Sequence, residues 1–252
     1  MTAAAHVFVT DLDRPSIGEA DRRHLSRVLR LRPGEAVSLA DGSGGWRLAR
    51  WDGRGELAPA GDVERRPRPD PMITIAFAVV KGDRSEWAVQ KLTELGVDRI
   101  VPMVSERVVV RWDGTRAAQA LARWRTVARA AAMQARLAWL PDVTEVTSWA
   151  DVAATGGGLG DGGGGAVVAV PGGGPLRLDR PTVLIGPEGG WAPHERDCGL
   201  PTAGLGPTVL RAETAAVAAA VLLVALRSGV VSPTPRVPDG ADAPPRVVRN
   251  CH

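Results

Sequence analysis

Apolar and polar residues follow different patterns in the first and second parts of the chain. Up to residue 66, the apolar positions come in short stretches. Val7–Val9 predicts a strand, and Ala36–Ala40 and Trp46–Trp51 predict a hairpin whose turn is the glycine-rich segment Asp41–Gly45. We therefore expect residues 1–66 to form a small β-rich domain.

A short helix is predicted between these strands. Asp21 is placed to cap it, and Leu25, Val28 and Leu29 fall on one face. The dipeptide Pro33-Gly34 is expected to end it, because proline and glycine both disfavour continuation of a helix.

From residue 72, strand patterns alternate with helix patterns. Met72–Val80 is a continuous apolar run, which is typical of a buried parallel strand. Asp83–Glu86 has the sequence of a capping box, for a helix that runs through Leu95 and ends at Gly96. The other expected elements are strands at 99–103, 167–170 and 182–185, a long helix at 117–136, a helix starting near Pro193 and a last helix at 213–227. This alternation predicts an α/β domain with a mostly parallel sheet over residues 72–230.

Three segments lack a regular pattern. Arg65–Pro71 contains three prolines and is expected to link the two domains. Gly156–Gly165 is expected to be a flexible surface loop, because it consists almost entirely of glycine. The tail, residues 231–252, carries five prolines and few apolar residues, so it is expected to be disordered.

Two segments near the C-terminal end combine a strand or helix with a glycine-proline loop. Val183–Trp191 reads VLIGPEGGW, and Leu205–Ala215 reads LGPTVLRAETA. Glycine allows the backbone to approach a ligand closely, and proline holds a loop in one conformation. Because loops at the carboxyl ends of parallel strands form the ligand sites of open α/β sheets, we expect a small-molecule site here.

Composition narrows the cellular setting. The two cysteines, Cys198 and Cys251, argue against a disulfide framework and for a reducing compartment. The first residues lack the basic and apolar regions of a secretory signal, and the longest apolar run, 215–226, is too short to cross a bilayer. We expect a cytoplasmic protein without a membrane partner.

The charge is small overall and unevenly distributed. The net charge is +3, but residues 21–32 carry five arginines against one aspartate, and residues 107–136 carry seven against one. Either cluster is compatible with a solvated helix face. The two together favour an RNA partner, because the planar guanidinium suits phosphates and bases.

Several common sites are excluded or unsupported. The chain contains no P-loop sequence. Gly158–Gly163 matches the dinucleotide-binding pattern, but it lies in a glycine-only context and precedes a strand rather than following one. His194-Glu195 begins like a zinc-protease motif without its second histidine, and Cys251-His252 is near the end of the predicted tail. No metal is expected.

The strings IGPEGG at 185–190 and LGPTVLRAET at 205–214 resemble the SPOUT superfamily of RNA methyltransferases, most closely the family that makes 3-methyluridine in bacterial 16S ribosomal RNA. The segments 23–34, 81–86, 90–96 and 105–107 also resemble that family. The resemblance implies a PUA-like RNA-binding β-barrel, followed by a catalytic domain in which two loops form a trefoil knot. It further implies S-adenosylmethionine as cofactor and a homodimer with the cofactor site at the subunit interface.

The resemblance also implies site residues. Cofactor binding is expected from two loops, at Leu184, Ile185, Gly186, Pro187, Glu188, Gly189 and Gly190 and at Leu205, Gly206, Leu210 and Arg211. Glu188 and Glu213 are the carboxylates nearest these loops and are candidates to accept the uracil N3 proton, with Arg211 as a cation for the uracil anion. RNA contacts are expected at Arg23, His24, Arg27, Arg30, Lys81, Arg84, Arg107 and Arg136.

Two departures from the family and two rival functions accompany this assignment. Ala212 stands where the family has threonine, and Met133 where it often has an acidic residue. A SPOUT enzyme acting on another RNA or atom, and a catalytically silent RNA-binding protein, remain alternatives. The base that removes the proton and the target nucleotide are left open.

Two further expectations concern bulk and substrate shape. Valine at Gly189 or Gly206 is expected to abolish cofactor binding by filling space that the ligand needs. Because the chain has no tyrosine and only two phenylalanines, a folded ribosomal RNA is expected as substrate rather than a naked single strand.

Overall fold

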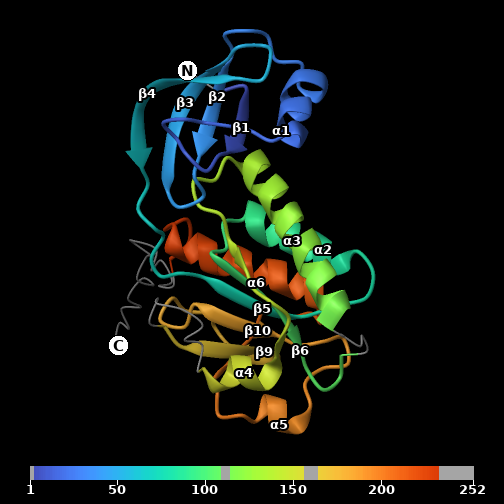
Figure 1. The fold of residues 1–252 in the computed structure, drawn as a ribbon. Coiled ribbons are helices and arrows are strands. Elements are labelled where there is room, and N and C mark those ends of the chain that lie inside the picture. The colour runs from blue at the N-terminus through green and yellow to red at the C-terminus, as the bar shows by residue number, and fades with distance from the viewer. Residues whose placement is uncertain (1–2, 109–113, 156–163, 233–252) are drawn as a thin grey trace, which may run out of the picture.

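The computed structural model describes residues 3–108, 114–155 and 164–232. Figure 1 shows a small N-terminal sheet stacked on a larger α/β unit, with helix α3 (Gly114–Ala135) reaching from one to the other. Residues 233–252 of the predicted tail and 156–163 of the glycine-rich segment lie outside the described residues.

The N-terminal sheet has the strand order β1-β2-β3-β4. Its strands are β1 (Ala5–Phe8), β2 (Ala36–Ala40), β3 (Gly45–Trp51) and β4 (Leu57–Arg65). The predicted hairpin is confirmed, because β2 and β3 pair antiparallel from Ala36 with Arg50 to Ala40 with Trp46. β1 pairs parallel with β2. Closure of this sheet into a barrel remains a prediction.

The predicted helix exists, but its cap and its apolar face are wrong. Helix α1 (Glu19–Arg23) begins after Gly18 and continues as a wide turn, η1 (His24–Val28). Asp21 therefore lies inside the helix instead of capping it. The widened turn rotates the later side chains, so that Leu25 is buried while Val28 and Leu29 are exposed.

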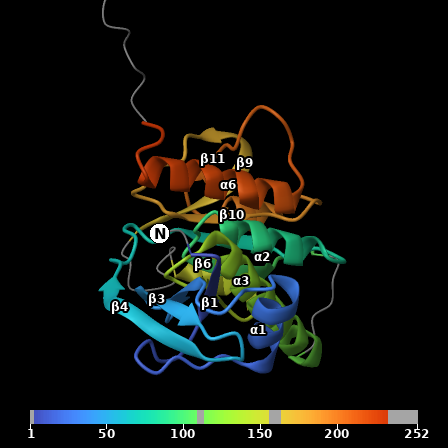
Figure 2. The same cartoon turned by 90° about the horizontal axis from the view of Figure 1, so that it is seen from above.

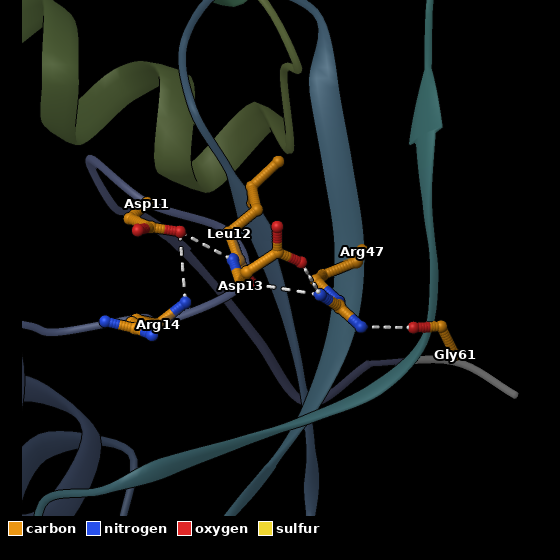
Figure 3. Close-up of polar contacts among 6 residues, drawn as sticks. All are labelled: Asp11, Leu12, Asp13, Arg14, Arg47 and Gly61. Carbon is orange, nitrogen blue, oxygen red and sulfur yellow. Dashed lines mark hydrogen bonds and ion pairs between the residues drawn. The ribbon is translucent and has the colours of Figure 1, made fainter.

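Strand β4 was not predicted, because Pro59, Gly61 and its charged residues do not resemble a buried strand. It pairs only with β3 and forms an edge, where proline is tolerated. Arg47 of β3 ties this edge to the loop after β1. Its guanidinium donates to the Gly61 carbonyl, the Leu12 carbonyl and the Asp13 carboxylate (Figure 3).

The second sheet is parallel throughout its described pairings and has the order β11-β9-β10-β5-β6-β7. The strands are β5 (Thr74–Ala78), β6 (Arg99–Val104), β7 (Asp142–Val143), β9 (Ala166–Gly174), β10 (Thr182–Ile185) and β11 (Thr202–Ala203), and β8 (Thr147–Ser148) pairs with β6. The predicted α/β class is confirmed. Threading of the loops into a knot remains a prediction.

Helices cover both faces of this sheet. α2 (Arg84–Glu94), α3 and α6 (Ala212–Arg227) pack together over the main core (Figures 1 and 2). α4 (Trp149–Ala154) covers a smaller core on the other side, and α5 (Pro193–Arg196) follows β10. Such covering explains why β5 and β10 are buried at every position and are apolar after their first residue, a threonine in each.

The capping box predicted for α2 is wrong. Asp83 occupies the N-cap position, but its side chain makes no capping hydrogen bond. The Ser85 hydroxyl instead donates to the Val80 carbonyl and accepts from the Val80 amide. Glu86 forms an ion pair with Arg123 of α3. The acidic residue thus joins two helices rather than closing the end of one.

The N-terminal sheet is held against α3 by polar contacts that are partly or fully buried. Arg129 of α3 donates to both carboxylate oxygens of Asp21, at 2.7 and 3.1 Å, and to the Phe8 carbonyl at 3.1 Å. Nearby, His6 contacts the Ser38 hydroxyl at 2.8 Å and the Leu137 carbonyl at 3.1 Å. Burial, with a further contribution from Arg136 and Arg66, lowers the pKa of His6 to about 4.

Candidate functional site

A mainly apolar pocket lies where the loop after β10 meets the segment that leads into α6. It is lined by Ala169, Val170, Pro171, Ile185, Gly186, Pro187, Glu188, Gly190, Trp191, Leu205, Gly206, Thr208, Val209, Leu210, Ala212 and Ala215. The two glycine-proline segments singled out in the sequence therefore face one cavity. Glu188 is the one ionisable group among the described residues of this lining.

The loop after β10 is tightly built. The indole of Trp191 packs against Gly186, where an added Cβ would lie 2.8 Å from the ring, and its Nε1 donates to the Ala169 carbonyl at 3.0 Å. Gly190 has a φ of +71°, a conformation that glycine adopts without strain. The backbone of this loop is thus held at the pocket wall, with no room for a side chain at residue 186.

Most of the predicted cofactor contacts line the pocket. They are Ile185, Gly186, Pro187, Glu188, Gly190, Leu205, Gly206 and Leu210. Three others do not. Leu184 points to the opposite face of the sheet, where it is buried with Val152, because neighbouring side chains of a strand alternate. Gly189 lines a neighbouring cavity, and Arg211 is the exposed N-cap residue of α6.

Part of the lining was missed by the sequence reasoning. Ala169, Val170 and Pro171 belong to β9, and Ala212 and Ala215 to the first turns of α6. These small apolar residues carry no chemical signal of their own. Only their position at the carboxyl edge of the sheet, beside β10, makes them pocket residues.

The glycines expected to be most restrictive are not the crowded ones. A Cβ at Gly189 would make ordinary contacts with Arg107, at 3.5 Å and beyond. A Cβ at Gly206 would have no atom of another described residue within 4 Å, apart from its chain neighbours. Gly206 does adopt a φ of +138°, so a larger residue there would strain the backbone. Crowding by the protein itself is therefore found at Gly186, and the loss of ligand space expected from valine at Gly189 or Gly206 stays a prediction.

Arg84, at the start of α2, lies between the two candidate catalytic carboxylates. It forms an ion pair with Glu188, and its Nη1 is 3.5 Å from Oε1 of Glu213. The hydrogen bond that Arg84 donates to the Glu188 carboxylate is the main reason why the pKa of Arg84 is raised above its usual value. The cation beside these glutamates is thus Arg84, which was expected to bind RNA, rather than Arg211.

Glu213 differs from Glu188 in its surroundings. Its side chain is only 9% exposed, against 49% for Glu188. Its Oε2 is buried and has no hydrogen-bond partner among the described residues. Glu213 also lies in the first turn of α6, where the helix dipole favours a negative charge. A buried acceptor without a donor is costly unless a ligand satisfies it.

A second, basic cavity adjoins the apolar pocket and shares Pro187 and Glu188 with it. Lys81, Arg84 and Arg107 line this basic niche, together with Gly189. The Arg107 guanidinium donates to the Gly189 carbonyl at 3.0 Å. Three residues predicted to contact RNA are therefore brought together at the edge of the predicted cofactor pocket.

The loop that carries Arg107 is anchored to the loop after β10. Glu195 is 2% exposed, and its carboxylate accepts from the Glu106 amide at 2.8 Å and from the Ala192 amide at 3.0 Å. This carboxylate satisfies backbone donors from both loops and fixes the distance between the niche and the pocket.

The other predicted RNA contacts are dispersed. Arg23, His24 and Arg27 are exposed along α1 and η1, Arg30 is exposed just after η1, and Arg136 is exposed beyond the end of α3. Three of the described arginines in 107–136 have partners within the protein. Arg129 binds Asp21, Arg123 binds Glu86, and Arg125 donates to the Val143 carbonyl.

Two other classes of site find no support in the part of the chain that is described. No cluster of three or more histidine, cysteine, aspartate or glutamate residues there is arranged to hold a metal ion. No helix within the described ranges has the length and apolar character needed to span a membrane.

Known proteins share this architecture and these loops. Residues 67–224 match the family described as RNA methyltransferase domain, and residues 17–50 match the RNA methyltransferase PUA domain. The Ribosomal RNA small subunit methyltransferase E of Mycobacterium tuberculosis is 39% identical over 228 residues, covering 78% of this chain and 80% of that protein.

Solved structures agree with the sequence matches. A ribosomal RNA small subunit methyltransferase E from Neisseria gonorrhoeae, bound to S-adenosyl methionine, is 27% identical with a TM-score of 0.70, covering 89% of this chain and 97% of that one. A methyltransferase from Legionella pneumophila with bound S-adenosylmethionine is 26% identical with a TM-score of 0.75, covering 89% and 98%. This chain belongs to the ribosomal RNA small subunit methyltransferase E family, a group of SPOUT-type RNA methyltransferases with a PUA domain.

Proposed function

We propose that this protein methylates N3 of a specific uridine in 16S ribosomal RNA of the small subunit, with S-adenosylmethionine as methyl donor. Its family membership supports the reaction, and the related structures that contain the cofactor support the donor. The observation that carries the proposal is the junction of an apolar pocket with a basic niche through two shared residues, Pro187 and Glu188.

The apolar pocket fits the proposed cofactor. S-adenosylmethionine has an adenosyl group, a positive sulfonium and no phosphate. The lining offers close backbone approach at Gly186, apolar walls and the carboxylate of Glu188, with no cation among its described residues. A phosphate-bearing nucleotide would find no counter-charge there. When bound, the cofactor supplies an electrophilic methyl group.

The basic niche suits the target uracil. N3 becomes nucleophilic when its proton leaves, and negative charge then spreads onto the uracil oxygens. Lys81, Arg84 and Arg107 are placed to stabilise that charge. To enter the niche, the base must leave its stack, as in other enzymes that modify bases.

We assign proton acceptance to Glu213. The N3–H group of uracil is a donor, and the buried Oε2 of Glu213 is an acceptor without a partner. Arg84 lies 3.5 Å from the other oxygen of this carboxylate and places a positive charge beside it. Glu188 is the competing candidate, but its exposed side chain is already paired with Arg84.

The proposed reaction is tested by following methyl transfer to small ribosomal subunits from a strain that lacks the enzyme. Mass mapping of the product should place one methyl group on the base of a single uridine. A methyl group on ribose, or on transfer RNA alone, would contradict the proposal. Cofactor binding without any transfer would identify a silent RNA-binding protein.

We also propose a homodimer with α6 at its interface. Val221 and Leu222 are exposed on α6, and Val209 at the rim of the apolar pocket is 87% exposed. A second copy over this strip would remove apolar surface from water and close the pocket. Light scattering should give a dimer mass, and the Val221→Asp, Leu222→Asp variant should be monomeric. A monomeric wild type would refute this arrangement.

The substrate proposed here is folded RNA within the assembled subunit, which places the enzyme in the cytoplasm. Trp51 and Trp124 are buried in the two cores, and so cannot serve as stacking platforms for single strands. The exposed arginines of α1 and η1 suit backbone contacts across a folded surface. Faster methylation of intact subunits than of protein-free RNA or a short oligonucleotide would support this.

A further inference from the structure

A group of arginines at the junction of the two domains is not used by the proposed chemistry. Arg65, Arg66 and Arg68 belong to the linker region, and Arg136 follows α3. All four are exposed. We call these four arginines, with Trp46 and Trp139, the junction surface. Figure 1 places β4, which leads into the linker, and helix α1 on opposite edges of the N-terminal domain, and Figure 2 agrees.

Two of these arginines stack on tryptophan rings. The guanidinium carbon of Arg66 lies 5.0 Å from the ring centroid of Trp46, and that of Arg68 lies 5.4 Å from the centroid of Trp139. Stacking uses the flat face of a guanidinium and leaves its N–H edge available. That edge matches the geometry of phosphate oxygens.

The ring platform is rigid. The Trp139 Nε1 donates to the Arg66 carbonyl at 3.2 Å, and the Arg66 amide donates to the Gly44 carbonyl at 2.8 Å. Gly44 leaves no room beside Trp139, since an added Cβ would lie 2.6 Å from the ring. The stacked arginines are thus held in place before any ligand arrives, which lowers the entropic cost of binding.

The positive charge of this surface is largely uncompensated. No carboxylate pairs with Arg66, Arg68 or Arg136 within the described residues, and Arg65 has a distant contact of 3.8 Å with Asp41. The charges of Arg136 and Arg66 also help to keep the buried His6 neutral. A cluster of exposed positive charges held over aromatic rings favours binding of the negatively charged RNA backbone over binding of a protein partner.

We propose that the junction surface binds phosphates of the ribosomal RNA substrate, away from the target nucleotide. This inference rests on the proposed function for the identity of the RNA. With α1 and η1 on the other edge, the N-terminal domain would contact folded RNA on two sides. The junction surface then contributes to affinity, while the methyl transfer step is unaffected.

The test uses the full-length protein with Arg66 and Arg68 both replaced by glutamine. Binding of 16S RNA should weaken about tenfold at moderate salt, and the slope of log affinity against log salt should fall by about 2. The KM for small subunits should rise, while kcat and the affinity for S-adenosylmethionine stay unchanged. The matched control is Arg177→Gln with Arg180→Gln, which removes two charges paired with Asp179 elsewhere.

A purely structural role would behave differently. If the arginines only fix the linker, the glutamine variant should lose thermal stability while its salt slope stays that of wild type, and this result would overturn the proposal. Lysine at both positions should restore the slope without restoring the stacking. A slope that stays reduced with lysine would also overturn it. Failure of the wild type to methylate small subunits would refute the proposed function. The salt slopes would still show whether the junction surface binds RNA phosphates.

Discussion

Two arginines of this protein, Arg129 and Arg84, occupy contrasting environments. Arg129 is held by several partners: it donates to both oxygens of Asp21 and to the Phe8 carbonyl, and it lies 6.0 Å from the Phe8 ring centroid. Arg84 divides its charge between Glu188 and Glu213, and Glu213 keeps a buried oxygen without a partner.

This difference in hydrogen-bond partners distinguishes an arginine with a structural role from one with a proposed functional role. A closed network such as that of Arg129 has no capacity for a ligand, so it serves to fix the N-terminal sheet on α3. An open network beside a cavity is costly to the fold and is kept where a substrate completes it. The charge of an arginine therefore says less about its role than the completeness of its partners.

The strongest test of this contrast is Glu213→Gln. An amide cannot accept the N3 proton as a carboxylate does, so kcat should fall by about 100-fold or more. The melting temperature should change little, because Oε2 has no partner and the contact of Oε1 with Arg84 is long, at 3.5 Å. Glu188→Gln is the matched control, and a larger loss of kcat in that variant would move proton acceptance to Glu188.

The converse is expected for Arg129→Gln. The change leaves Asp21 partly buried without its cation, and the free energy of unfolding should fall by about 2 kcal/mol, less than for a fully buried pair because Arg129 is partly exposed. Urea unfolding measures this. Asp21→Asn and the double variant complete a double-mutant cycle, which gives the coupling energy between Arg129 and Asp21. A coupling energy near zero would contradict the closed network.

Gly186→Ala probes the pocket that adjoins the open network. The added methyl group would press on Trp191, so affinity for S-adenosylmethionine should fall by roughly tenfold. Gly189→Ala is the control, because its Cβ would meet only ordinary contacts. Calorimetry compares the two, and equal losses would show that crowding at Trp191 is not the cause.

A pH dependence at the domain contact is expected from His6, with no effect near neutral pH. Its pKa is lowered from 6.5 to about 4 in the folded state, so the unfolded chain binds more protons between these values. Its contribution to stability should therefore be present above pH 6.5 and be lost as pH falls towards 4. Unfolding midpoints of wild type and His6→Gln should diverge in this window, and parallel profiles would exclude His6 as the source.

Local sequence predicted the elements whose signals are local. The β2–β3 hairpin and strands β5 and β10 follow from turn residues and apolar runs. The cap at Asp21, the capping box at Asp83 and the apolar face at Val28 and Leu29 failed, because long-range contacts compete with local ones. Asp21 pairs with Arg129, which is 108 residues away in sequence.

The glycine-proline loops could be read as a ligand site, since backbone approach depends on residue type. Their neighbours Ala169 and Ala215 could not, because only the sheet order brings β9 and α6 to the same cavity. Composition likewise predicted an RNA partner. Composition could not distinguish the structural role of Arg129 from the proposed functional role of Arg84, because the two residues are of the same type.

The sequence by itself determined the fold class, the family and the two glycine-proline loops that line one pocket, because these depend on periodicity and on residue types at fixed spacing. Only the tertiary structure decided which charges are satisfied. Whether Glu213 keeps a free oxygen, or Arg66 and Arg68 lie on tryptophan rings, depends on distances between segments far apart in the chain. Electrostatic and hydrogen-bond energies vary steeply with such distances, and the order of residues does not contain them.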